Sequence, residues 1–364
     1  MQKTFFKKHK ISFLVVLAIL LISALTFGFC KKQTAVKEDL FGDGFQIHFI
    51  DVGQADCALV ACDGKFMLID GGNSDDSSTV YTYLKKYGIT ELEYIIATHA
   101  HEDHVGGLSG ALNFAKAQNA FCPVTEYDSK AFDDFVKNLD RQGLEITVPS
   151  PGDSFELGSA QVDIFACNST EDTNNTSIVL KITYGQTSFL FTGDAEYECE
   201  KYILDHGYDL SSTVLKVGHH GSSTSTSYRF LREVMPEYAI ISVGKDNEYG
   251  HPHEEVVSRL DDADVTVYRT DISGDIICIS DGKSVTFKHS KGNPYATEKS
   301  SASRAQKTEV QQERRDMVLN TKSKKYHETG CDSIGSIAES NKKSVQYTQS
   351  EVEALGYSPC GSCH

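Results

Sequence analysis

Residues 98–104, T-H-A-H-E-D-H, constrain the fold more than any other part of the sequence. They place three histidines and two carboxylates directly after an apolar run at residues 94–97, which predicts a buried strand ending in a loop. Such a loop can direct several imidazoles to one point, and imidazole and carboxylate groups suit zinc and similar divalent metals. We therefore expect a metal site at the end of this strand.

Other metal-capable side chains follow predicted strands in the same way. Asp70 closes F-M-L-I-D-G-G, Asp194 closes S-F-L-F-T-G-D, and His219 and His220 close V-L-K-V-G-H-H-G-S. Each of these residues also has a simpler interpretation when it is taken alone. Asp194 could cap the N-terminus of a helix, Asp70 could be a turn residue, and His219 could be a buried histidine with satisfied hydrogen bonds. Their repetition predicts that these side chains meet at one rim of the strands.

The order of predicted elements indicates an α/β fold. Two strand-rich halves with helices between them predict two sheets packed face to face, with helices outside. The expected strands lie at 45–51, 55–62, 65–70, 94–98, 120–124, 160–166, 177–184, 187–192, 213–217 and 238–243, with three more before 288. The expected helices lie at 77–87, 106–116, 128–142, 195–206, 225–234 and 254–262.

The motifs resemble a known family. H-A-H-E-D-H, with D-G-G before it and T-G-D and H-H-G-S after it, resembles the metallo-β-lactamase fold. More narrowly, F-I-D-V-G-Q-A-D at 49–56, L-K-V-G-H-H-G-S at 215–222 and S-V-G-K-D-N-E-Y-G-H-P-H at 242–253 resemble the hydrolase domain of ComEC-type competence proteins. The resemblance spans residues 45–280 and implies an αββα sandwich holding two divalent metals, zinc or manganese.

The resemblance also implies a ligand set. His219 is preferred to His220 as the ligand from the H-H-G-S motif, with His220 as the reserve. The family pattern has a further histidine near 168–177, where this sequence has Asn168, Asn174 and Asn175. The implied ligands are His99 and His101 for the first metal, Asp103, His104 and His219 for the second, and Asp194 bridging both.

Two adjacent cations clamp a phosphoryl transition state and lower the pKa of water, so no nucleophilic serine is required. Asp70 is expected to orient the site. Asp103 is also expected to be catalytic. His220 or His253 is expected to donate a proton or to stabilise the leaving group. The residues expected to bind substrate are Gly221, Ser222, Ser223 and Asn175. The alternative for His251 and His253 is a turn around Pro252.

Charge is unevenly distributed along the chain. Residues 45–290 carry 17 Lys and Arg against 39 Asp and Glu, a net charge of −22. A body this acidic is not shaped to coat a polyanion, which argues against broad nucleic-acid binding.

The N-terminus predicts export or anchoring. Lysines at positions 3, 7, 8 and 10 precede an uncharged stretch at residues 11–29, which has nearly the length of a bilayer span. These lysines favour an inside N-terminus. We expect a single-pass anchor in residues 1–30, a tether at 31–44 and an extracytoplasmic body at the cell membrane. A secreted protein, or a lipoprotein through Cys30, is the alternative.

The C-terminal part predicts a separate unit. Residues 291–318 are polar and are expected to form a disordered linker between the body (45–290) and a module at 319–364. In the module, His327 and Cys331 form one close pair and Cys360 and Cys363 another, a set that suits one structural zinc. Y-H-E-T-G-C and G-Y-S-P-C-G-S-C resemble the zinc module of Ada-type DNA-repair proteins. Disulfides are the alternative, although three cysteines cannot all pair within the module.

These observations lead to one main functional hypothesis. We expect a membrane-tethered, metal-dependent phosphodiesterase that acts on DNA, because the resemblance is to DNA-uptake proteins. A cell-envelope phosphodiesterase of the teichoic-acid phosphorylcholine esterase type is one alternative. A non-catalytic DNA-capture module is another. The expected partners are DNA or another phosphodiester, and the membrane, with no obvious protein partner.

Overall fold

The computed structural model describes residues 44–166, 170–291, 315–347, 352 and 355–360. The chain divides into two compact units, residues 1–297 and 298–364, and each is described by itself. Among the described residues, no helix combines the length and the apolar character that a bilayer crossing requires. The expected anchor at 1–30, nearly all of the tether, and Cys363 lie outside the described residues.

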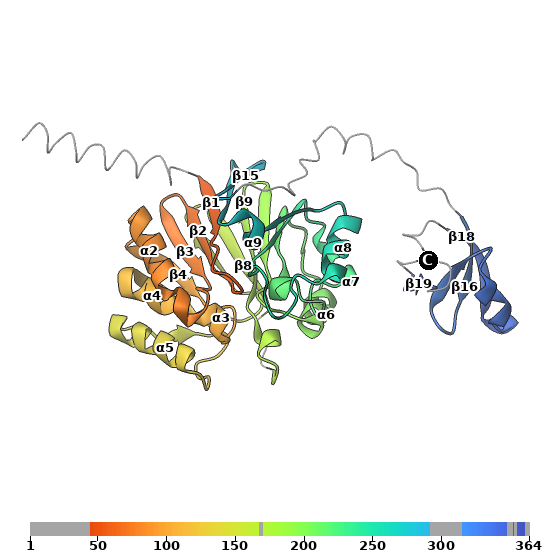
Figure 1. The fold of residues 1–364 in the computed structure, drawn as a ribbon, viewed down its shortest axis with the longest axis horizontal. Helices are drawn as coiled ribbons and strands as arrows, with labels where there is room; N and C mark the ends of the chain where they lie inside the picture. Colours follow the sequence, from red (N-terminus) through yellow and green to blue (C-terminus); the bar gives the residue numbers. More distant parts are fainter. Residues whose placement is uncertain (1–43, 167–169, 292–314, 348–351, 353–354, 361–364) are drawn as a thin grey trace, which may run out of the picture. The chain divides into compact units, whose positions relative to one another are not determined.

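The body contains two sheets (Figure 1). The first has the strand order β15-β14-β1-β2-β3-β4-β5-β6, and β3 to β6 run parallel. Its strands are β1 (Phe45–Phe49), β2 (Ala58–Cys62), β3 (Lys65–Ile69), β4 (Glu91–Ile96), β5 (Lys116–Phe121), β6 (Ile146–Thr147), β14 (Ile276–Ser280) and β15 (Val285–His289).

The second sheet has the order β13-β12-β11-β10-β9-β8-β7, and β10 to β13 run parallel. Its strands are β7 (Ser154–Leu157), β8 (Ala160–Ala166), β9 (Val179–Tyr184), β10 (Thr187–Phe191), β11 (Val214–Lys216), β12 (Tyr238–Ile241) and β13 (Thr266–Arg269). Each sheet thus has a parallel half, and carboxyl ends of parallel strands share one edge.

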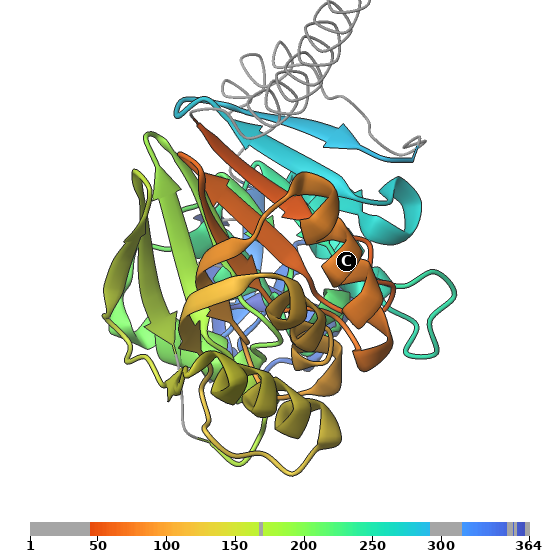
Figure 2. The same cartoon turned by 90° about the vertical axis from the view of Figure 1, so that its left-hand side faces the viewer.

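Helices cover the outer face of each sheet. In the turned view, α2, α4 and α5 lie in front of the first sheet (Figure 2). The helices are α2 (Ser77–Tyr87), α3 (Glu102–Val105), α4 (Leu108–Phe114), α5 (Lys130–Gln142), α6 (Tyr197–His206), α7 (Tyr228–Val234), α8 (Glu254–Asp262) and α9 (Thr270–Ser273), with short 3₁₀ turns η1 (Ser74–Asp76), η2 (Asn174–Thr176) and η3 (Gly218–Gly221).

Three buried apolar clusters correspond to these layers. One joins the first sheet to α2, α4 and α5, and includes Leu84 and Phe135. A second lies between the two sheets, where the Phe45 and Phe189 rings stack with centroids 4.7 Å apart. The third joins the second sheet to α6, α7 and α8, and includes Phe230. This layering is the αββα sandwich that the resemblance implied.

The helix expected at 106–116 forms only as α4 (Leu108–Phe114), and a break separates it from the preceding turn α3 (Glu102–Val105). The break lies at Gly106 and Gly107, where the backbone of the turn after β3 approaches closely. A Cβ atom on Gly106 would lie 2.3 Å from the backbone nitrogen of Ser74, and one on Gly107 would lie 1.8 Å from the carbonyl oxygen of Gly71. The two glycines therefore let this turn pack directly beneath the histidine-rich loop.

The tail unit is a four-stranded sheet of order β18-β16-β17-β19. It packs around a small core that includes Met317 and the fully buried Tyr326. β16 begins before residue 319, so the last residues of the expected linker pair with β17 and β18 and belong to the tail sheet. The strands are β16 (Arg315–Asn320), β17 (Lys325–Glu328), β18 (Lys342–Tyr347) and β19 (Ser358–Pro359).

Candidate metal centre

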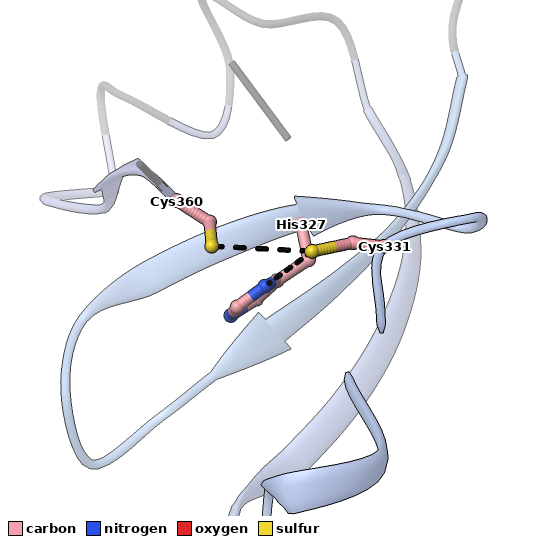
Figure 3. A group of neighbouring side chains, drawn as sticks. All are labelled: His327, Cys331 and Cys360. Atoms are coloured by element: carbon pink, nitrogen blue, oxygen red, sulfur yellow. Dashed lines mark hydrogen bonds between the residues drawn. The ribbon is translucent and has the colours of Figure 1, made fainter. Parts of the chain in front are cut away.

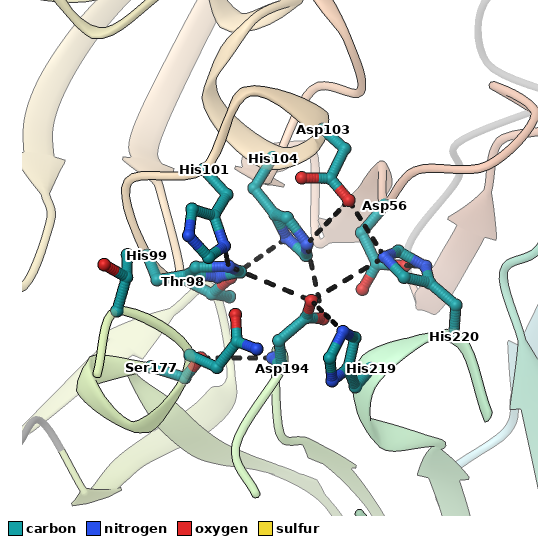
Figure 4. Close-up of polar contacts among 12 residues, drawn as sticks. Asp56, Thr98, His99, His101, Asp103, His104, Ser177, Asp194, His219 and His220 are labelled. Carbon is teal, nitrogen blue, oxygen red and sulfur yellow. Dashed lines mark hydrogen bonds and ion pairs between the residues drawn. The ribbon is translucent and has the colours of Figure 1, made fainter. Parts of the chain in front are cut away.

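The metal-capable side chains follow the carboxyl ends of parallel strands in both sheets. Asp70 follows β3 and the 98–104 loop follows β4, whereas Asp194 follows β10 and the His219–His220 turn follows β11. Figure 4 shows the histidines of the 98–104 loop, Asp103, Asp194, His219 and His220 gathered where the two sheets meet. Asp103, His104, Asp194 and His220 each offer a ligand atom within 4.8 Å of the others.

Asp70 fixes the orientation of His104. Its Oδ2 atom lies 2.9 Å from Nδ1 of His104, and its two oxygens also accept hydrogen bonds from the backbone N–H and the hydroxyl of Thr98, at 2.7 and 2.8 Å. A carboxylate accepts here, so Nδ1 of His104 carries the ring proton. The Nε2 atom of His104 therefore points to the centre, where a divalent cation would replace any proton on it.

His220 is oriented in the same way by a backbone carbonyl. Its Nδ1 atom lies 3.0 Å from the carbonyl oxygen of Ser242, which can only accept. Its Nε2 atom lies 3.2 Å from Oδ2 of Asp103 and 3.8 Å from Oδ2 of Asp194. Burial lowers the pKa of His220, but Asp194 and Asp56 more than offset this and raise it to about 10.

The arrangement around Asp194 fits a divalent cation. Oδ1 of Asp194 and Nε2 of His104 are buried 3.3 Å apart, and neither makes a hydrogen bond. Burial lowers the pKa of His104, but Asp194, Asp70 and Asp103 more than offset this and raise it well above its ordinary value, so the carboxylates favour a positive charge at this point, which a bound cation would supply. Burial raises the pKa of Asp103, yet His104 and His220 lower it to about 2, so a carboxylate faces the same point.

His99 and His101 form a second pair beside Asp194. Nε2 of His99 lies 3.0 Å from Nδ1 of His101 and 3.9 Å from Oδ2 of Asp194. Desolvation and the neighbouring His104 hold the pKa of the buried His99 well below its ordinary value, so this ring is neutral and can ligate. Asp194 therefore lies between the two histidine groups, where one carboxylate can serve two cations.

His219 lies beside this group and not within it. Its Nε2 atom is 3.7 Å from Oδ2 of Asp194, and its Nδ1 atom is 3.2 Å from Oε1 of Glu196. Both His219 and His220 have positive φ, 48° and 53°, which turns the buried His220 ring inward. The geometry thus favours His220 over the expected His219 as the ligand, because adjacent side chains in this turn diverge.

Asp56 and Lys216 also belong to the centre, although no role was assigned to them from the sequence. The Lys216 Nζ atom lies 2.8 Å from Oδ2 of Asp56, and Oδ1 of Asp56 lies 3.3 Å from Nδ1 of His220. Together with Asp70 they line a small cavity beneath the centre. A lysine inside the apolar run V-L-K-V was the available signal, since a buried lysine requires a partner.

The residues expected to contact the substrate, and His253 beside them, form hydrogen bonds with neighbouring residues of the protein. The backbone N–H of Ser223 donates to Nδ1 of His253 at 2.9 Å, so the proton of the His253 ring is on Nε2. The Ser222 hydroxyl is 2.9 Å from that of Thr224. Asn175 is buried, and its side-chain oxygen accepts from backbone N–H groups of residues 196 and 199, so this oxygen stabilises the start of α6.

The tail unit contains its own cluster of ligand atoms (Figure 3). Nδ1 of His327 lies 3.5 Å from Sγ of Cys331, and the sulfur atoms of Cys331 and Cys360 are 3.9 Å apart. That separation is roughly twice the length of a disulfide bond. These three buried side chains could hold one metal ion, and the expected fourth ligand, Cys363, is outside the described residues.

Comparisons with known proteins agree with this architecture. The sequence profile described as "Metallo-beta-lactamase superfamily" matches residues 50–245. The chain is 30% identical over 251 residues to ComE operon protein 3 of Bacillus subtilis, covering 64% of this chain and 32% of that protein. It is 32% identical over 240 residues to Recombination protein 2 of Haemophilus influenzae, covering 64% of this chain and 28% of the relative.

A third relative is competence protein ComA of Neisseria gonorrhoeae, which is 30% identical over 226 residues, covering 62% of this chain and 30% of the relative. The chain therefore spans about a third or less of these relatives. Among solved structures, the metallo-beta-lactamase fold protein YhfI of Bacillus subtilis has a TM-score of 0.45 and 13% identity, covering 65% of this chain and 100% of that one. The profile match and the competence relatives show that this chain belongs to the metallo-beta-lactamase superfamily of metal-dependent hydrolases, within which it is related to ComEC-type competence proteins.

Proposed function

We propose that the body hydrolyses phosphodiester bonds in DNA with the help of divalent cations held by its centre. The observation that carries this proposal is the convergence of Asp103, His104, Asp194 and His220, with two imidazole Nε2 atoms facing two carboxylates. When bound, divalent cations supply polarisation of a phosphoryl group and acidification of a water molecule. Asp103, His104, Asp194 and His220 would hold the second cation, and His99, His101 and Asp194 would hold the first.

The chain itself supplies orientation and a hydrogen-bond donor. Asp70 and the Ser242 carbonyl keep His104 and His220 in the tautomers that direct Nε2 inward. His253 has its proton on Nε2 because Nδ1 accepts from Ser223. We assign this N–H of His253 a hydrogen bond to the leaving oxygen of the cleaved ester, where negative charge develops in the transition state. Gly221, Ser222 and Ser223 would contact the phosphate oxygens.

DNA is the preferred substrate because the relatives include proteins named for competence and recombination. The test is the purified chain from residue 40 onward, loaded with Zn²⁺ or Mn²⁺, on plasmid DNA, on single-stranded oligonucleotides and on p-nitrophenylphosphorylcholine. We expect DNA hydrolysis that Asp194→Ala reduces by about 100-fold or more, because the variant loses the carboxylate shared by both cation sites. Asp205→Ala, on the exposed side of α6, is the matched control. Hydrolysis of the choline ester alone would assign the enzyme to envelope substrates.

We also propose that residues 11–29 anchor the chain in the cell membrane with the body outside the cytoplasm. The lysines before this stretch and the acidic body after it support the proposal. Protease added to intact cells should remove the body, while a cytoplasmic protein survives. Protection of the body until lysis would show the opposite orientation.

For the tail, we propose one structural zinc bound by His327, Cys331, Cys360 and Cys363. The three buried ligand atoms and the absence of a disulfide-length contact between Cys331 and Cys360 support it. A set of one imidazole and three thiolates suits tetrahedral zinc. Metal analysis of the reduced chain tests this stoichiometry directly.

A further inference from the structure

The loop after β12, residues 242–253, borders the metal centre and is held firmly against it. The backbone N–H of His253 donates to the carbonyl oxygen of Gly221 at 2.9 Å. A Cβ atom on Gly221 would lie 2.5 Å from Cβ of Pro252, so loop and turn are packed closely. The loop is therefore attached to the η3 turn that carries His220.

Asn247 braces the loop from inside. Its amide Nδ2 donates to the carbonyl oxygens of Gly244 and His251, at 2.9 and 2.6 Å, and its Oδ1 accepts from the backbone N–H of His251 at 3.0 Å. Gln54 adds a hydrogen bond of 3.0 Å to the backbone of Gly244. A side chain presented by this loop is accordingly held in place before any ligand arrives, which lowers the entropic cost of binding.

The large aromatic side chain that this loop presents to solvent is Tyr249, which is 62% exposed. Its ring stacks on His251, with centroids 5.7 Å apart and planes 23° apart. The His251 ring in turn lies 6.4 Å from that of His220, at 24°. The rings of Tyr249, His251 and His220 thus form a series that leads from the solvent to a candidate metal ligand.

Tyr228 provides a comparison within the same unit. It is 59% exposed, but Arg259 lies over its ring at 5.4 Å and its hydroxyl bonds to Asp262. Its exposure is accounted for by these neighbours on α8. Tyr249 instead extends its aromatic face from the border of the centre.

We propose that Tyr249, supported by His251, is a stacking platform for an unpaired base of a nucleic acid strand whose adjacent phosphodiester lies at the metal centre. This inference rests on the proposed function and names the substrate form that the site selects. Stacking on an aromatic ring recognises every base and needs no basic surface, which matches a body of net charge −22. A paired base within a duplex cannot offer its face in this way.

The shape of the platform decides against a choline headgroup. Recognition of a quaternary ammonium uses several aromatic walls set around the cation. Tyr249 and His251 are nearly parallel and offer one flat face, which matches the flat shape of a base. The exposed charged neighbours in this loop, Lys245, Asp246 and Glu248, sum to −1, so they offer a phosphate no net attraction.

The experiment varies the protein and the substrate independently. Metal-loaded wild type and Tyr249→Ala are compared on a labelled oligothymidylate and on an abasic oligomer of equal length and charge. Binding is measured by anisotropy with phosphorothioate versions, and hydrolysis with ordinary ones. Wild type should bind the oligothymidylate about tenfold more tightly than the abasic strand, Tyr249→Ala should bind both alike, and Tyr249→Phe should restore the preference.

The outcomes separate this inference from the proposed function. Tyr228→Ala, an equally exposed tyrosine removed elsewhere, should leave the base preference unchanged. A preference that persists in Tyr249→Ala, or a loss of p-nitrophenylphosphorylcholine hydrolysis without any change for the oligomers, overturns the stacking role. If wild type hydrolyses no phosphodiester at all under loaded conditions, the proposed function fails, while the binding comparison still decides the stacking.

Discussion

Lys216 and Asp56 form a buried ion pair directly beneath the metal centre. The Nζ atom of Lys216 is 2.8 Å from Oδ2 of Asp56, and their side chains are 3% and 6% exposed. Burial raises the pKa of Asp56, but Lys216 and His220 overcome this effect and hold the pKa well below its ordinary range. Asp56 therefore stays ionised behind His220. Its negative charge is balanced by the ammonium group of Lys216.

Lys216→Met should destabilise the metal-free body strongly, because it leaves the Asp56 carboxylate buried without its cation. We expect a loss of about 3–5 kcal/mol in the free energy of unfolding. The double variant with Asp56→Asn should recover much of that loss. Urea denaturation followed by circular dichroism measures both. A single variant within 1 kcal/mol of wild type, on the scale of an exposed ion pair, would contradict the buried pairing.

His220→Ala should remove bound metal from the second site, since its Nε2 atom faces both Asp103 and Asp194. His219→Ala should weaken metal binding much less, because the His219 ring is directed partly to Glu196. Titration with a competing chelator, with Asp103→Ala as a positive control, measures the two affinities. Equal losses in the two histidine variants would contradict the assignment of His220.

Asp70→Asn should lower metal affinity by about 10–100-fold with little change in fold. Thr98 N–H would keep its acceptor, while the new amide would face Nδ1 of His104 as a donor. The proton of His104 would then move to Nε2, where it blocks ligation. Asp75→Asn, on the exposed side of the same segment, is the control. Unchanged affinity in Asp70→Asn would show that the tautomer of His104 is set elsewhere.

His48 should make the body sensitive to mild acid. Burial and the neighbouring Lys86 lower the pKa of His48 to about 4, and its Nδ1 lies 2.8 Å from the Tyr83 hydroxyl. The unfolded chain has the ordinary value of about 6.5, so only the unfolded state takes up the proton between these values. The contribution of neutral His48 to the free energy of unfolding is complete above pH 6.5. It is lost progressively as the pH falls toward 4, and the loss is on the order of 3 kcal/mol.

The matching experiment compares the pH dependence of unfolding in the metal-free parent and in His48→Gln. The variant should lose less stability between pH 6.5 and 4, whatever its stability at neutral pH. His206→Gln, on the exposed end of α6, should follow the parent curve. Parallel curves for His48→Gln and the parent would contradict the buried neutral form of His48.

Chelation should expose the tail to protease while the body persists, because zinc-binding energy is folding energy in so small a unit. The reduced full chain should bind one more zinc than Cys331→Ser, whereas Cys62→Ser, a buried body cysteine, should bind as much as wild type. Formation of a stable disulfide in place of zinc binding would contradict the proposal.

The sequence predicted the sandwich and the rim of metal-capable side chains, because strand periodicity and polar residues at strand ends are local signals. The choice between His219 and His220 was not local: it depends on two positive φ angles and on the Ser242 carbonyl from the next strand. Likewise, Asn175 was assigned to substrate binding, although its oxygen is used by the backbone of α6. Lys216 and Asp56 are far apart in sequence, so their pairing required the packing of the two sheets.

The division of the ligands between the sheets has a thermodynamic consequence. Asp103 and His104 are carried by the first sheet, and Asp194 and His220 by the second, so a cation held by all four ties together the two halves of the sandwich. Binding to the native state alone raises the unfolding free energy with the logarithm of free metal concentration. The resistance of the body to unfolding would then vary with the local supply of divalent metal, and scarcity would shorten the lifetime of the protein as well as stop its activity.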